Sequence, residues 1–118
     1  MTSENIWRYA PEAGHEPGRD LVGFSVEAKD GSIGTIDENS DEVGSSFIVV
    51  DTGPWIFGKQ VLLPAGTITR VDVETRTVHL DRTKDEVKDA PEFDAAKFGG
   101  EPSYLEKFGL YYGRLPHL

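Results

Sequence analysis

The sequence of 118 residues contains no cysteine. Without thiols the chain forms no disulfide, offers no thiolate to a zinc ion and has no cysteine nucleophile. Long apolar runs are also absent. The longest is Phe47-Ile48-Val49-Val50, whereas a membrane-spanning helix needs about 20 apolar residues. Residues 1–20 lack the apolar core of a secretory signal, and we expect a soluble, cytoplasmic protein without a membrane span.

Basic residues are scarce as well. The 12 Lys and Arg stand against 21 Asp and Glu, which gives a net charge of −9. The average field of such a chain repels nucleic-acid phosphates and anionic lipid surfaces, and the sequence contains no basic run. We therefore expect no direct contact with nucleic acid.

Residues 21–82 carry short apolar segments separated by turn signals at intervals of about 8 to 12 residues. Val22, Phe24 and Val26 alternate with small or polar residues, which is typical of a half-buried strand. The run Phe47–Val50 predicts a strand buried on both faces. The pattern predicts an all-β fold, a small barrel or sandwich. Strands are expected at 22–28, 32–37, 47–50, 61–63, 67–72 and 76–80.

Two helix signals follow the strands. Thr83 and Glu86 have the spacing of a capping box, which predicts a short helix at 84–89 that Pro91 ends. Residues 102–106 repeat this signature, and a second short helix is expected near 104–112. Between them, residues 95–101 include Gly99-Gly100 and are predicted to be a linker. The chain is thus divided into a flexible N-terminal arm at 1–20, a β domain at 21–94 and a C-terminal aromatic extension at 95–118.

Two motifs resemble ligand-binding loops, and each lacks an essential residue. Gly53 to Gln60 nearly matches a phosphate-binding loop, but Gln60 stands where a hydroxyl must bind magnesium, and a strand follows where a helix is needed. Asp37 to Glu42 opens like a calcium loop, but Glu42 replaces the required glycine. The three histidines have no metal-binding spacing. We predict no catalytic residues, no cofactor and no metal site, and a protein that is not an enzyme.

Aromatic side chains are the remaining candidates for a function. Trp55-Ile56-Phe57 caps the core or forms a contact patch. The aromatic extension docks on the chain's own sheet, which is the more common arrangement, or on a partner or second copy. If they bind a partner, the candidate residues are Trp55, Phe57, Tyr104, Phe108, Tyr111 and Tyr112.

Taken in order, these segments resemble the PRC-barrel domain family. The family pattern of a strand followed by "xDGxxIGxVxD" is similar to Leu21–Val26 and Asp30–Ile36. Phe47–Asp51 and Val61–Pro64 resemble its next two strands. Val78–Leu80 resembles the closing hairpin, and Tyr111-Tyr112 resembles the ending of stand-alone members. The resemblance covers about residues 21–94.

The resemblance implies a small antiparallel β-barrel of about six strands with short C-terminal helices, used as a docking module without an active site. The same barrel occurs in the H subunit of photosynthetic reaction centres and in the ribosome maturation factor RimM. We therefore expect a non-catalytic protein-interaction or adaptor module, with self-association as one form of it. The alternatives are a ribosome- or RNA-processing-associated factor, and a small-ligand binder or enzyme.

Overall fold

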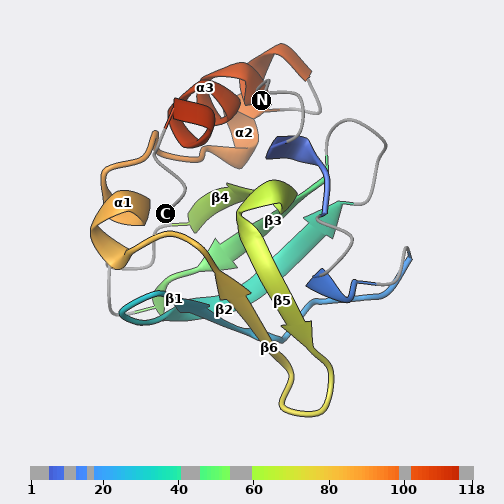
Figure 1. Ribbon diagram of the computed structural model, residues 1–118. Helices are drawn as coiled ribbons and strands as arrows, with labels where there is room; N and C mark the ends of the chain where they lie inside the picture. The colour runs from blue at the N-terminus through green and yellow to red at the C-terminus, as the bar shows by residue number, and fades with distance from the viewer. Residues whose placement is uncertain are drawn as a thin grey trace.

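The computed structural model describes residues 6–9, 13–15, 18–40, 46–53, 60–98 and 102–114. Its main feature is one six-stranded sheet with the strand order β4-β3-β2-β1-β6-β5. Three short α-helices accompany it (Figure 1). The strands are β1 (Ser25–Ala28), β2 (Gly31–Ser40), β3 (Phe47–Asp51), β4 (Gln60–Pro64), β5 (Ile68–Asp72) and β6 (Thr77–Leu80). The prediction of a β-rich fold with six strands is confirmed.

The pairing of the strands differs from the predicted antiparallel barrel. Strands β1 to β4 form successive antiparallel pairs and β5 pairs antiparallel with β6, but β1 and β6 run parallel, with Ser25 opposite Thr77. The sheet is therefore mixed, and the all-antiparallel prediction is wrong. Among the described strands, β4 and β5 each pair on one side only, which leaves the sheet open. Residues 65–67 form a 3-10 turn that carries the chain directly from β4 to β5, so the two edge strands come close together at this turn.

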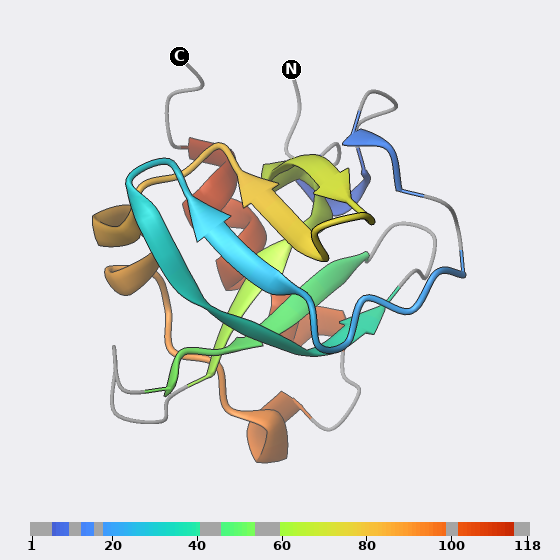
Figure 2. The ribbon, with the colours of Figure 1, turned by 90° about the horizontal axis from the view of Figure 1, so that it is seen from below.

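The sheet is strongly bent around its interior (Figure 2). Its register shifts between Val26 and Glu27 on β1 and between Ile36 and Glu38 on β2. Bulges of this kind bend a strand and increase its twist. At the bend β2 passes very close to β3: a Cβ on Gly34 would lie 2.1 Å from the carbonyl oxygen of Asp51. Only glycine fits there.

Alternating residues of β3 face two apolar clusters. Ile48 and Val50 belong to an inner cluster enclosed by the bent sheet, and Phe47 and Val49 belong to an outer cluster. The predicted burial of this strand on both faces is confirmed. The outer cluster consists of Phe47, Val49, Leu62, Phe93, Leu105 and Phe108.

The helices lie over the outer face of the sheet and at one end of it. Helix α3 (Glu106–Arg114) packs against β4, and in Figure 1 α2 (Ala95–Phe98) lies below α3 and α1 (Lys84–Lys88) lies at the left edge of the molecule. The capping box of α1 is present as predicted. The helix predicted near 104–112 is found as the 3-10 turn Pro102–Leu105 followed by α3. Residues 95–98, predicted to be linker, form α2 instead, because Asp94 accepts hydrogen bonds from the Ala96 and Lys97 N–H groups at its start.

The N-terminal segment, predicted to be a flexible arm, contributes buried residues to the core, while Arg8 and Gly18 are exposed. Ile6 and Ala13 are buried in the inner cluster. The Ser46 N–H donates to the Trp7 carbonyl at 3.1 Å. A Cβ on Gly109 of α3 would lie 2.8 Å from the Trp7 indole nitrogen. The aromatic ring of Trp7 therefore takes the space that this glycine leaves.

No helix in the described part of the chain is long and apolar enough to cross a membrane.

Candidate protein-interaction surfaces

The C-terminal extension brings a group of aromatic rings onto the outer face of β3 and β4. The ring centroids of Phe93 and Phe108 lie 6.2 Å apart, and those of Tyr104 and Phe108 lie 5.7 Å apart. Phe98 completes the group, 5.7 Å from Tyr104. These tilted arrangements suit the aromatic quadrupole. The rings cover Phe47, Val49 and Leu62, which the sheet would otherwise expose.

The predicted partner-binding residues of the extension dock largely on the chain itself. Phe108 and Tyr112 are fully buried, so these two are not exposed aromatics, which corrects that part of the expectation. The reason is their spacing of four residues on α3, which turns both side chains toward the sheet. Tyr104 and Tyr111 are half-buried. Trp55 and Phe57 lie outside the described residues. Whether any of the six contacts a partner stays a prediction.

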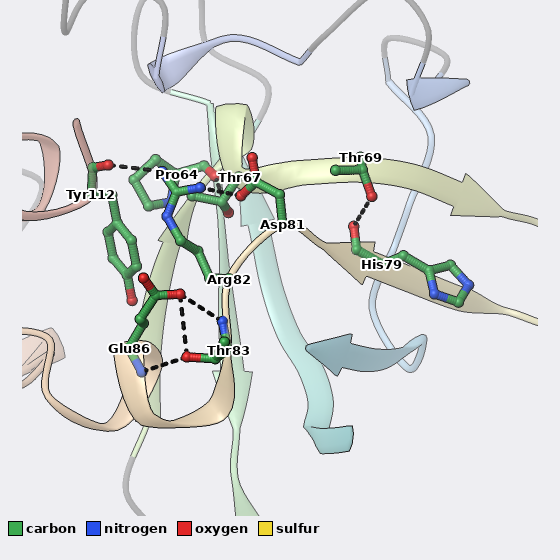
Figure 3. Close-up of polar contacts among 9 residues, drawn as sticks. All are labelled: Pro64, Thr67, Thr69, His79, Asp81, Arg82, Thr83, Glu86 and Tyr112. Carbon is green, nitrogen blue, oxygen red and sulfur yellow. Dashed lines mark hydrogen bonds and ion pairs between the residues drawn. The ribbon is translucent and has the colours of Figure 1, made fainter. Parts of the chain in front are cut away.

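Arg82 connects the extension to the sheet and is itself fully buried. Its Nη2 donates to the Tyr112 carbonyl at 2.8 Å, and its Nη1 pairs with Asp81 (Figure 3). The Arg82 carbonyl accepts from the Lys29 N–H at 2.8 Å. A cation near the C-terminal end of α3 also suits the helix dipole. Sequence reasoning missed this residue, although strand alternation places Arg82 on the inward face of Val78 and Leu80.

The two adjacent tyrosines of α3 differ in their hydrogen bonding. The Tyr111 hydroxyl donates to the Glu86 carbonyl at 2.6 Å and ties α3 to α1. The Tyr112 hydroxyl is buried, and no hydrogen-bond partner lies within reach among the described residues. Burial raises the pKa of both phenols, and the nearby Asp89 and Glu86 carboxylates raise the pKa of Tyr111 further. Both side chains are therefore neutral at physiological pH.

The solvent side of α3 and of the 3-10 turn before it forms what we call the extension surface, made of Tyr104, Lys107, Leu110 and Tyr111. Leu110 is 53% exposed. The ammonium group of Lys107 lies 4.3 Å from the centroid of the Tyr104 ring. Spacings of three and four residues place these side chains on one side of the helix. The result is a small apolar and aromatic surface with one cation.

A second exposed surface lies at the turn between β5 and β6, and we call it the hairpin tip. It is made of Val22, Val73, Glu74 and Arg76. Val22 and Val73 are 45% and 42% exposed, and with Leu110 they are the exposed large apolar side chains of the described residues. In Figure 1 this turn projects at the bottom of the molecule, and α3 lies at the top. The two surfaces are thus at opposite ends.

Neither ligand-binding motif gains support from the described residues. Gln60 begins β4, so a strand follows the phosphate-loop-like sequence, as predicted. Asp37 and Asn39 lie in β2 and are used within the fold: Asp37 accepts from Gln60 at 2.5 Å, and Asn39 accepts from the Leu21 N–H at 3.2 Å. Within the described ranges, no group of three His, Asp or Glu side chains is placed to hold a metal ion.

Similarity to known proteins is found in solved structures. No family model matches the sequence. A search of curated proteins found no match. The fold is similar to a crystal structure of a Pseudomonas aeruginosa protein described as the 16S ribosomal RNA processing protein RimM, with 20% identity and a TM-score of 0.47. The match covers 64% of this chain and 50% of that chain, so the chain spans about half the length of that protein. RimM is one of the two proteins named above in which the PRC barrel occurs.

Proposed function

We propose that this protein is a non-catalytic protein-interaction module that docks a partner through the extension surface. The observation that carries the proposal is the exposure of Leu110 on a helix whose other large apolar side chains are buried or half-buried. On the same surface the Lys107 ammonium group lies over the Tyr104 ring. Tyrosine is enriched among the residues that contribute most of the binding energy at interfaces, and the exposed leucine adds apolar area that binding can bury.

The rigidity of the extension surface supports the same function. Arg82 binds the C-terminal end of α3 through a hydrogen bond to the Tyr112 carbonyl. The Tyr111 hydroxyl binds α3 to α1 through a hydrogen bond to the Glu86 carbonyl. Phe108 fixes the opposite face of the helix in the outer cluster. A surface whose backbone is already ordered loses less entropy on binding. The half-buried tyrosines thus serve the fold and the surface together.

The test compares the wild-type chain with Leu110→Ser in quantitative affinity capture from the cells that make the protein. We expect a protein captured in stoichiometric amount by the wild type to be reduced by about tenfold or more, because truncating a central anchor costs a contact about 2 kcal/mol. Glu106→Gln, at an exposed position of the same helix, is the matched control and should capture as the wild type does. Equal capture by Leu110→Ser, with an unchanged melting temperature, would contradict the proposal.

The two alternatives predicted from the sequence remain predictions. A ribosome- or RNA-processing-associated role predicts that the captured partner is a ribosomal protein, and sedimentation with ribosomal subunits would detect it. A small-ligand binder or enzyme would need a concave site with convergent polar groups. A ligand-dependent rise in melting temperature across a metabolite panel would favour that alternative.

A further inference from the structure

We propose that the hairpin tip is a self-complementary surface through which two copies of this chain associate about a two-fold axis. The inference rests on the proposed interaction function but assigns self-association to a surface separate from the extension surface. Three features of the hairpin tip support it: an arginine held in a strained backbone conformation, a neighbouring carboxylate and two exposed valines.

Arg76 is the first of these features. Its φ of +54° is the one positive value at a non-glycine position among the described residues. Glycine adopts this conformation without strain, so a large side chain there is costly to the fold, and such outliers gather at functional sites. The Arg76 carbonyl accepts from the Ser25 N–H at 2.9 Å, which fixes the backbone. The strained residue is thus anchored at the end of the sheet.

The guanidinium of Arg76 is held at the surface. It lies 5.3 Å from the centroid of the Phe24 ring, and its Nη2 donates to the Val22 carbonyl at 3.4 Å. A Cβ on Gly23 would come within 2.9 Å of that nitrogen, so the glycine makes room for it. Arg76 is exposed, and its remaining N–H donors are available for a carboxylate in the planar, two-pronged geometry that arginine favours.

Glu74 supplies the opposite charge in the same turn. The neighbouring Asp72 carboxylate is already used: it accepts from the Glu74 and Thr75 N–H groups at 3.1 and 3.3 Å and pairs with Arg70 at 3.4 Å. These bonds fix the turn, and the hydrogen bond from Thr75 lowers the pKa of Asp72. The Glu74 side chain is exposed, and its carboxylate accepts no hydrogen bond from the described residues.

The charges of the hairpin tip favour a second copy of this chain as its binding partner. Residues 70–76 hold two arginines and two acids, so this segment is neutral in a chain with a net charge of −9. Two copies repel each other over most of their surface but not here. In a two-fold contact each residue pair occurs twice, so Arg76 of one copy meets Glu74 of the other in both directions. The exposed valines, Val22 and Val73, then lose water contact near the axis.

The test is sedimentation velocity of the full chain from about 10 µM to about 1 mM. This range suits the weak association that is expected when few residues form a contact. The average mass of the wild type should rise toward that of a dimer. Glu74→Arg and Arg76→Glu should each weaken association about tenfold or more, because each places like charges together. The double variant with both reversals should restore association, because it exchanges the signs and keeps the pairs.

Three results would overturn the proposal: a wild type that stays monomeric, single variants that associate like the wild type, or a double variant that stays as weak as the single ones. Leu110→Ser separates this proposal from the proposed function. If it abolishes association, self-association belongs to the extension surface and the hairpin tip is excluded. If the chain is monomeric yet captures a partner in a Leu110-dependent manner, only the tip proposal fails.

Discussion

At the scale of single residues, Tyr111 and Tyr112 offer a matched experiment within one turn of helix. The Tyr111 hydroxyl donates to the Glu86 carbonyl at 2.6 Å, whereas the Tyr112 hydroxyl is buried with no partner in the described structure. A buried hydroxyl without a partner costs about 1–3 kcal/mol, and a typical hydrogen bond stabilises a fold by about 1 kcal/mol. The two phenylalanine substitutions should therefore act in opposite directions.

We expect Tyr112→Phe to raise the free energy of unfolding by about 1 kcal/mol and Tyr111→Phe to lower it by about 1 kcal/mol. Urea unfolding followed by circular dichroism measures both, and each variant is the control for the other because both remove one oxygen from an α3 tyrosine. If Tyr112→Phe were as destabilising as Tyr111→Phe, the Tyr112 hydroxyl would have to be hydrogen-bonded, which the structure does not show.

At the scale of elements, α1 is a helix of five residues that depends on its cap. The Glu86 N–H donates to Thr83 Oγ1 at 3.2 Å, and the Thr83 N–H donates to Glu86 Oε1 at 2.8 Å. Thr83→Ala removes the side-chain acceptor and should lower the free energy of unfolding by about 1 kcal/mol. Thr83→Ser keeps the hydroxyl and should stay close to the wild type in the same urea titration. Equal losses in both variants would assign the effect to the threonine methyl group.

The elements also show what the sequence can and cannot predict. The strands were predictable because alternation and turn residues are local signals, and α1 was predictable because its capping box lies within four residues. The parallel pairing of β1 with β6 was not, since alternation is the same whichever neighbour a strand has. The aromatic extension was identified as a candidate, but the burial of Phe108 and Tyr112 depends on an outer sheet face that exists only after folding. Arg82 was missed because a charged residue after a strand ordinarily points to solvent.

At the scale of the whole molecule, the extension belongs to the folding unit as much as to the proposed docking surface. Phe108 lies in the outer cluster, and Tyr112 lies in the inner cluster four residues later. One helix therefore joins the two apolar clusters of the protein. In addition, removal of the helix takes the Tyr112 carbonyl acceptor away from the buried Arg82, and the loss of a hydrogen-bond acceptor from a buried charged group is destabilising.

Deletion of residues 95–118 leaves residues 1–94 and tests whether the β domain predicted at 21–94 folds without the extension. We expect the shortened chain to bind a hydrophobic dye and to lose its cooperative unfolding transition, because Phe47, Val49 and Leu62 lose their cover. In the full chain, Phe108→Ala should cost about 3–5 kcal/mol, and Leu110→Ala, on the solvent side of the same helix, should cost little. A shortened chain that unfolds cooperatively at the wild-type midpoint would show that the extension contributes no stability to the sheet. The buried cation and the outer cluster argue against that result, since both depend on the same helix staying in place.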